Sequence, residues 1–350
     1  MRLALPLLLN VMREPERMAT LSLSDWDKLL VVGRASGLLG RLGAWAQQRE
    51  ILDKIDEWPA HHLRDANLQA LQQHTTMRWE ISRIEYALRD VQTPIVLLKG
   101  AAYVLADTPA VAGRECSDID VLVGVDKLDE VEKALVAQGW AFDDLSPKDQ
   151  EYFRRWLHEL PPMRHDRRGT SVDVHHSLLP RTDKLFIDSS AFFARARSVT
   201  NSVSVLSPAD MVLHSAVHMF RNGDWAHALR DLSDQHALLR EFSRDEAFWE
   251  ELLLVAESLN LTKTCFYCLR YTQKYFLTPV PPEIASRVAR WRPAAPILNM
   301  FDRLVSRAVC PRYDDRSDGL RSLSLALLSC FPAPRVGAWL TPLFWTKRLR

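Results

Sequence analysis

The stretch Cys116-Ser117-Asp118-Ile119-Asp120-Val121-Leu122-Val123 carries two acids at alternate positions and is otherwise largely apolar. On a β-strand, alternate side chains point to the same face, so we predict a strand with Asp118 and Asp120 on one face and Ile119 and Val121 in the core. Aspartate is depleted in strands, and two of them in one strand therefore need a cause. Either they form a solvated strand face or a helix cap, or they hold a cation between them.

A third acid follows in Val172-Asp173-Val174-His175. The residues Pro162–His165 and Ser171–His176, separated by Arg167-Arg168-Gly169, predict a β-hairpin in which Asp173 and His175 share one face. Three carboxylates on neighbouring strands are oxygen ligands of the kind that Mg²⁺ or Mn²⁺ takes together with bound phosphates. Two such ions would clamp the attacking and leaving oxygens of a phosphoryl displacement.

Upstream, the apolar run Ile95–Leu98 ends in Lys99-Gly100, which predicts a buried strand followed by a short helix. Lys99 and Arg114 are basic residues near these acids, so each is a candidate for the site. Each has a structural alternative: Lys99 as an exposed strand cap, and Arg114 as a counter-charge to Asp118. His175 is either part of the site or a hydrogen-bonded neighbour of the acids.

Strands alternate with helices only in the middle of the chain. Residues 1–92 read as an N-terminal helical region, 93–206 as an α/β core and 207–350 as a C-terminal helical domain, and together they indicate an α+β protein. The stretch Ser22–Asp27 offers several candidate N-caps, and Ser146 and Ser207 precede helical patterns and are further candidates. Residues 63–88 predict a long helix, with a break or a second apolar contact near Gln73-His74.

Four parts of the sequence are similar to one known family: Leu98-Lys99-Gly100-Ala101-Ala102, Arg114, Ser117–Val123 and Val172–His175. The family that they resemble is a little-characterised bacterial branch of the DNA polymerase β superfamily of nucleotidyltransferases. The resemblance covers most of the chain from about Ser24 onward. It implies a nucleotidyltransferase fold, which is a polymerase β-like mixed sheet with flanking helices, placed between the two helical regions.

The resemblance also implies roles for single residues. Asp118 and Asp120 match the first two metal-binding acids of the superfamily, and Asp173 matches the third, which also helps to deprotonate the acceptor hydroxyl. Gly100 matches the glycine that lets the backbone approach the triphosphate. The usual glycine-serine pair is Gly100-Ala101 here, so the hydroxyl that would touch phosphate is missing.

Lys99, Arg114 and His175 are therefore expected beside the nucleotide, where Lys99 or Arg114 would replace the missing contact. The expected activity is Mg²⁺-dependent transfer of a nucleoside monophosphate from an NTP to an acceptor hydroxyl, with release of pyrophosphate. The rival hypothesis is a degenerate nucleotidyltransferase fold that acts as a binding or regulatory partner, which Ala101 favours and the three acids oppose.

The acceptor is left open between a small molecule, a sugar, a protein side chain and an RNA end. With 45 Lys and Arg against 44 Asp and Glu, the net charge of +1 argues against a long nucleic acid. His214 and His218, which share a helical face, are candidates to line the nucleotide cleft.

Five scattered cysteines and the lack of an export signal favour the cytoplasm. The segment from Arg335 onward has four cations, no acid and several aromatic residues. Such a tail is typical of packing on the protein itself or, less often, of contact with a membrane surface.

Overall fold

The structure is a computed structural model that describes residues 4–310 and 319–329, apart from 143, 144, 182, 184, 186 and 224. Within this part of the chain the centre is a seven-stranded mixed sheet with the order β3-β4-β5-β2-β1-β7-β6. β2 runs parallel to β5 and β1 parallel to β7, and the other neighbours are antiparallel. The strands are β1 (Ile95–Leu97), β2 (Asp118–Leu122), β3 (Trp140–Phe142), β4 (Met163–His165), β5 (Ser171–His175), β6 (Arg197–Ser198) and β7 (Val203–Val205). The predicted hairpin is present as β4 and β5.

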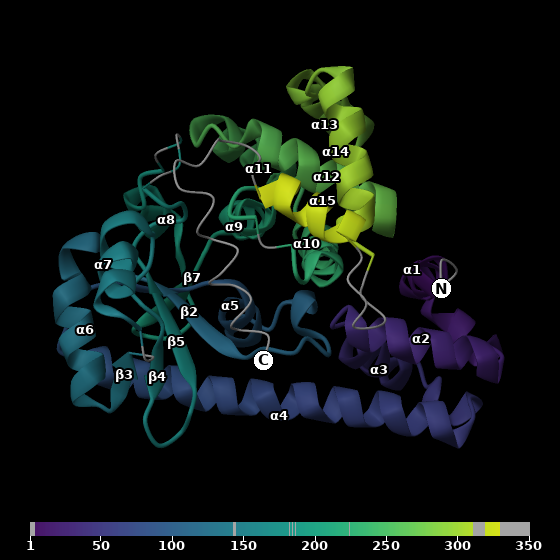
Figure 1. Cartoon of the computed structure of the whole chain (residues 1–350), viewed down its shortest axis with the longest axis horizontal. Coiled ribbons are helices and arrows are strands. Elements are labelled where there is room, and N and C mark those ends of the chain that lie inside the picture. The colour runs from purple at the N-terminus through teal and green to yellow at the C-terminus, as the bar shows by residue number, and fades with distance from the viewer. Residues whose placement is uncertain are drawn as a thin grey trace.

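Helices surround this sheet and extend well beyond it (Figure 1). Helices α6 to α8 lie around the sheet at the left of the view. Helices α9 to α15 form a second body above the sheet and to its right, and α1 to α3 lie at the right. The helices are α1 (Ala4–Arg13), α2 (Leu23–Ala35), α3 (Leu39–Gln48), α4 (Glu57–Leu88), α5 (Lys99–Leu105), α6 (Leu128–Ala137), α7 (Pro147–Trp156), α8 (Ser190–Arg195), α9 (Pro208–Phe220), α10 (Ala228–Phe242), α11 (Phe248–Ser258), α12 (Thr262–Phe276), α13 (Pro282–Val288), α14 (Ala295–Ala308) and α15 (Gly319–Ser329). The α+β class expected from the sequence is confirmed.

Three helices begin at serines that were among the predicted N-cap candidates. The side chains of Ser22, Ser146 and Ser207 each accept a hydrogen bond from a backbone N–H of the first turn that follows. Proline occupies the first turn of α7 and of α9, where its fixed φ and missing N–H carry no penalty. These short-range signals therefore fixed the helix starts as expected.

The long helix α4 is continuous from Glu57 to Leu88, so the break predicted near Gln73-His74 is wrong. One face of the helix is buried at Leu63, Ala70, Met77, Ile81, Ile84 and Leu88. Leu68 and Leu71 lie off this face and are about half exposed, at 55% and 49%. An exposed leucine costs a helix little, so these two residues did not need a second contact.

Helix α4 lies along the lower edge of the molecule, beneath both the sheet and α3 (Figure 1). It packs against α3, α5 and α6. The approach of α3 is close because two of its glycines meet backbone atoms. A Cβ on Gly43 would lie 2.2 Å from the carbonyl oxygen of Leu63, and one on Gly40 would lie 2.4 Å from that of Gly113.

We predict that Gly43→Ala lowers the free energy of unfolding by about 1–3 kcal/mol, because the new methyl group forces α3 away from α4. This loss outweighs the roughly 1 kcal/mol by which alanine favours a helix over glycine. The measurement is urea unfolding followed by circular dichroism. The matched control is Gly33→Ala in α2, where the atoms nearest to a Cβ would be two leucine methyl groups at 3.4 Å and the Cα of Leu39 at 3.7 Å, so stability is unchanged or slightly raised. Equal stability of the two variants would contradict the close-packing argument.

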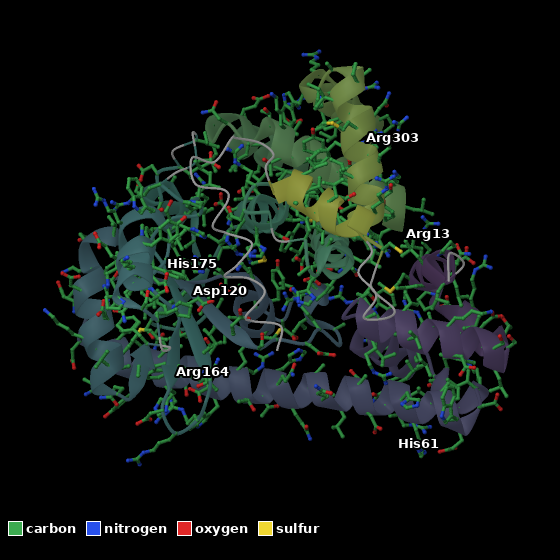
Figure 2. The ribbon with its side chains drawn as sticks, in the orientation of Figure 1. Arg13, His61, Asp120, Arg164, His175 and Arg303 are labelled. Carbon is green, nitrogen blue, oxygen red and sulfur yellow. The ribbon has the colours of Figure 1, made fainter. Side chains whose placement is uncertain are left out.

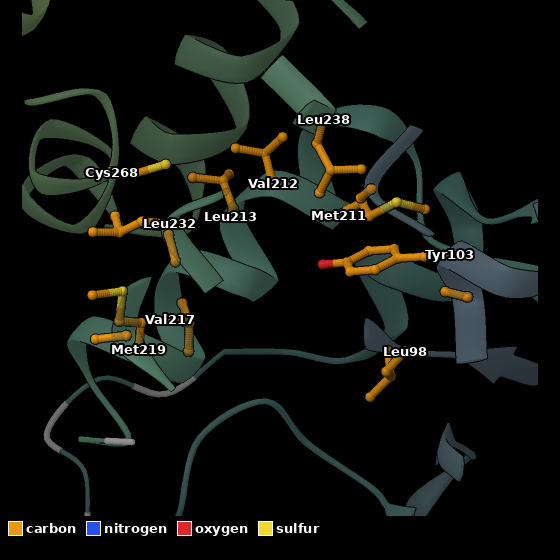
Figure 3. Close-up of a cluster of buried hydrophobic side chains, with 14 of the residues drawn as sticks. Leu98, Tyr103, Met211, Val212, Leu213, Val217, Met219, Leu232, Leu238 and Cys268 are labelled. Carbon is orange, nitrogen blue, oxygen red and sulfur yellow. The ribbon is translucent and has the colours of Figure 1, made fainter. Parts of the chain in front are cut away.

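A buried apolar cluster joins the sheet to the C-terminal helices (Figure 3). Leu98 and Tyr103 come from the end of β1 and from α5, Met211 and Leu213 from α9, and Leu238 from α10; all are at most 4% exposed. Helix α9 also contacts α10, α11 and α12. The C-terminal helices are therefore built onto the sheet through α9.

None of the helices within the described residues is both long and apolar enough to cross a bilayer. The apolar and basic tail from Arg335 onward, whose two interpretations were left open, lies outside the described residues.

Candidate functional site

The acids predicted from the sequence lie on two adjacent parallel strands at the centre of the sheet. Asp120 of β2 is paired directly with Asp173 of β5, and Leu122 with His175. Paired residues of neighbouring strands project to the same face, so Asp118, Asp120, Asp173 and His175 share one face of the sheet. Asp120 and Asp173 are buried, at 3% and 5% exposure, whereas Asp118 at the start of β2 is half-buried.

The carboxylate of Asp120 is the centre of this group. Its Oδ1 accepts hydrogen bonds from Nζ of Lys99 at 3.1 Å and from Nε2 of His175 at 2.9 Å. Figure 2 shows Asp120 and His175 side by side in the sheet. Burial alone would raise the pKa of Asp120, but Lys99 and His175 outweigh it and hold that pKa well below its usual value. Asp120 is therefore an ionised carboxylate at neutral pH.

Lys99 follows β1 in a backbone conformation that residues with side chains seldom adopt. Its φ is +44°, in the left-handed region, and this placement directs its ammonium group to Asp120. Burial would lower the pKa of Lys99, but Asp120, Asp118 and Glu159 outweigh it and raise that pKa. With a side chain that is 20% exposed, Lys99 is part of the acidic site and not the exposed strand cap of the alternative interpretation.

His175 connects Asp120 to a second acid. Burial would lower the pKa of His175, but the hydrogen bond to Asp120 and the charge of Glu159 raise it. Its Nε2 lies 3.4 Å from Oε2 of Glu159. His175 therefore holds two carboxylates in place on one face of the sheet.

Gly100 and Arg114 lie against each other. A Cβ on Gly100 would lie 2.6 Å from Nη1 of Arg114 and 3.0 Å from Sγ of Cys116, so a larger residue here would have to displace the side chain of Arg114. Arg114 is buried, and its Nε donates to Oδ2 of Asp234 at 2.7 Å. Arg114 is thus the counter-charge of Asp234 in α10 and not, as the alternative had it, of Asp118.

Asp234 binds a second arginine as well. Nη2 of Arg41 in α3 donates to Oδ1 of Asp234 at 2.7 Å, and Nη1 of Arg41 donates to Oγ of Ser233 at 2.6 Å. Burial would raise the pKa of Asp234, but Arg114 and Arg41 lower it. This buried Arg41–Asp234–Arg114 cluster connects the N-terminal helices, the segment before β2 and the C-terminal helices.

Two residues of the site were not predicted from the sequence: His158 and Glu159. They lie between α7 and β4, where Glu159 forms an isolated β-bridge with His175. One ligand atom each of His158, Glu159 and His175 lies within 4.8 Å of the others. Within the described part of the chain, these three residues are the histidine, cysteine or acidic side chains that lie close enough together to hold one ion. The ligand atoms of Asp118, Asp120 and Asp173 do not all lie within that distance of one another. The irregular segment has no periodic pattern from which a site could be predicted. The only feature of its sequence that indicated a site was the pair of adjacent residues His158 and Glu159.

Histidines of α9 complete the surroundings. His214 is buried, and burial together with the charges of Lys99 and His175 lowers its pKa to about 3. The pKa of His218 is lowered well below its usual value by burial and by the charge of Lys99. The charge of Lys99 therefore acts on both histidines of α9, and their place in a nucleotide cleft stays a prediction.

The side chains present suit a divalent cation. Asp118, Asp120 and Asp173 supply hard carboxylate oxygens, which is the donor type that Mg²⁺ and Mn²⁺ take from proteins. Asp120 is ionised and accepts a hydrogen bond from Lys99, so a cation bound there would share this carboxylate with a lysine. The oxygen donors of the three aspartates are therefore of the type that suits a divalent cation, and they lie beside a lysine ammonium group.

Comparison with known proteins gives one match. A family model described as "Uncharacterised nucleotidyltransferase" matches residues 22–277, a range that contains the whole sheet, the acids and the helices from α2 to α12. No curated protein and no solved structure matches the chain.

Proposed function

Because the chain belongs to this family of nucleotidyltransferases, we propose that it transfers a nucleoside monophosphate from an NTP to an acceptor hydroxyl and releases pyrophosphate. The family supports nucleotidyl transfer in general. We propose four further points that the family match does not cover: the metal, the donor nucleotide, the acceptor and membership of the DNA polymerase β superfamily. The observation that supports it most is the direct pairing of Asp120 with Asp173 on one sheet face beside Lys99.

Asp118, Asp120 and Asp173 would hold the divalent cation, Mg²⁺ or Mn²⁺. A cation bound there neutralises the negative charge of the phosphates during transfer. The lowered pKa of Asp120 keeps this ligand ionised at any pH near neutral. Asp173, buried next to Asp120, would orient the acceptor hydroxyl and accept its proton.

Lys99 and Gly100 would receive the phosphates of the NTP. The side chain of Lys99 is 20% exposed, and its ammonium group could donate to a phosphate oxygen while it lies beside Asp120. Gly100 has no side chain that would keep a phosphate away from the backbone at the start of α5. Arg114 would act on the nucleotide by supporting Gly100, and His175 by orienting Asp120.

The acceptor would lie between the sheet and the C-terminal helices. A small molecule, a sugar or a protein side chain fits the balanced charge of the chain better than a long nucleic acid does. The use of an NTP and the four free cysteines in the described residues fit a cytoplasmic location, which stays a prediction.

The test is a thermal shift assay with each common NTP, with and without Mg²⁺. A ligand at about 100 times its Kd stabilises the fold by roughly 2.7 kcal/mol, which for a chain of this size is a shift of several degrees. We expect one NTP to give a Mg²⁺-dependent shift that Asp118→Asn abolishes, since Asp118 is half-buried and its loss leaves the core intact.

The control is Asp65→Asn, an exposed acid of α4, which should keep the full shift. If no NTP shifts the wild-type protein, the proposal fails. The degenerate fold that acts as a binding partner then becomes the better hypothesis, as Ala101 in place of the usual serine already favours.

A further inference from the structure

His158, Glu159 and His175 form a group of ligand side chains next to the aspartates but of different chemistry. One ligand atom from each lies within 4.8 Å of the other two. The backbone bridge between Glu159 and His175 fixes two of the three residues relative to each other. The rings of His158 and His175 are 5.3 Å apart between centroids, so the third residue is held close as well.

A second observation comes from His158. Its Nδ1 atom is buried and has no hydrogen-bond partner among the residues that the structure describes. A buried polar atom without a partner costs about 1–3 kcal/mol, so native proteins nearly always supply one. The unused lone pair or N–H of His158 therefore indicates that the segment after α7 is arranged for something besides the protein's own contacts.

We propose that His158, Glu159 and His175 bind a divalent transition-metal ion, with Zn²⁺ as the preferred ion, at a site separate from the Mg²⁺ of the aspartates. Imidazole nitrogen suits zinc and its neighbours, whereas Mg²⁺ takes oxygen ligands. Two histidines and one glutamate are a ligand set of catalytic zinc sites, which leaves a fourth position for water or substrate. This zinc site does not depend on the proposed nucleotidyl transfer, because its test measures only whether the metal binds.

Zinc at this group would change the contacts of Asp120. Nε2 of His175 lies 3.4 Å from Oε2 of Glu159 and is therefore the nitrogen that a shared ion would use. The same Nε2 lies 2.9 Å from Oδ1 of Asp120. A nitrogen bound to a metal has no hydrogen to donate, so occupation of the site removes His175 as a donor and leaves Lys99 on Oδ1 of Asp120.

The experiment is isothermal titration of the full-length, chelator-treated protein with ZnCl₂, with and without excess MgCl₂. We expect one Zn²⁺ per chain and no competition by Mg²⁺. His158→Gln and Glu159→Gln should each weaken binding by about 100-fold or more, since even outer partners of a metal site account for 10- to 100-fold. Co²⁺ as a second probe should give a visible absorption band that both variants lose.

The matched control is His61→Gln, an exposed histidine of α4, which should bind Zn²⁺ as the wild type does. Circular dichroism and thermal unfolding show whether each variant is folded. Unchanged zinc binding in folded His158→Gln and Glu159→Gln would overturn the proposal. So would loss of binding in Cys268→Ser, which would assign the ion to Cys265 and Cys268 of α12.

Failure of this proposal is separable from failure of the proposed function. Asp118→Asn should abolish the NTP-dependent thermal shift while it leaves zinc binding intact. Loss of zinc binding in Asp118→Asn would instead show that the two sites are one, and it would overturn the inference that they are separate.

Discussion

Asp120→Asn is expected to lower the rate of nucleotidyl transfer by about 10³-fold or more. The amide keeps the size of the side chain but removes the charge that pairs with Lys99 and that would hold the proposed cation. A bound cation contributes several kcal/mol to stabilising the charge of the transition state, and each 1.36 kcal/mol corresponds to a factor of about ten in rate. The rate is measured as pyrophosphate released from the NTP that binds, with clarified cell extract as the source of acceptor and the extract alone subtracted.

Asp65→Asn serves as the control, because it makes the same chemical change on an exposed face of α4 and should keep the wild-type rate. Folding of Asp120→Asn is checked by its circular dichroism spectrum and its melting temperature, since Asp120 is buried. A folded Asp120→Asn protein that keeps a tenth or more of the wild-type rate would rule out Asp120 as a metal ligand.

Asp234→Ala is expected to lower the free energy of unfolding by about 3–5 kcal/mol. The substitution leaves Arg41 and Arg114 buried with no carboxylate between them, and both guanidinium groups lose a hydrogen bond of 2.7 Å. Removal of one partner from a buried ion pair costs far more than the pair itself contributes, because an uncompensated charge stays in the core. For a chain that unfolds with roughly 5–15 kcal/mol, this is a large part of the total stability.

The measurement is urea unfolding, compared with Glu241→Ala on the same helix α10. Glu241 pairs with Arg244, whose side chain is 77% exposed, so its loss should cost less than about 1 kcal/mol. Should Asp234→Ala fail to fold, Asp234→Asn keeps one hydrogen-bond acceptor and should show a smaller loss. If Asp234→Ala and Glu241→Ala lower the free energy of unfolding equally, the buried cluster contributes no more to stability than an exposed ion pair does.

The local structure could be predicted because its causes are local. Alternation of acids and apolar residues identified β2, and Ser146 and Ser207 identified the starts of α7 and α9. For α2 the stretch Ser22–Asp27 offered several possible starts, of which Ser22 is the one observed. The shared face of Asp118 and Asp120 follows from strand geometry alone. Their place beside Asp173 was expected from the resemblance and is observed in the register of β2 and β5.

The contacts that could not be predicted join residues far apart in the chain. Arg114 and Asp234 are separated by 120 positions, and no pattern near Arg114 indicates which acid it will meet. His158 and Glu159 come to His175 through an isolated bridge in an irregular segment. The exposed Leu68 and Leu71 led to a false break in α4, because periodicity cannot tell a tolerated exposed leucine from one that needs a partner.

The lysine in a left-handed conformation at the end of β1 has a consequence for how the protein matures. Many small metal sites fold only when their ion arrives, since the ligands repel one another without it. Here the chain supplies a positive charge of its own to Asp120 from Lys99, only 21 positions away. A cation that binds there, as proposed, would therefore join a carboxylate whose charge is already balanced, and folding would not depend on the metal supply.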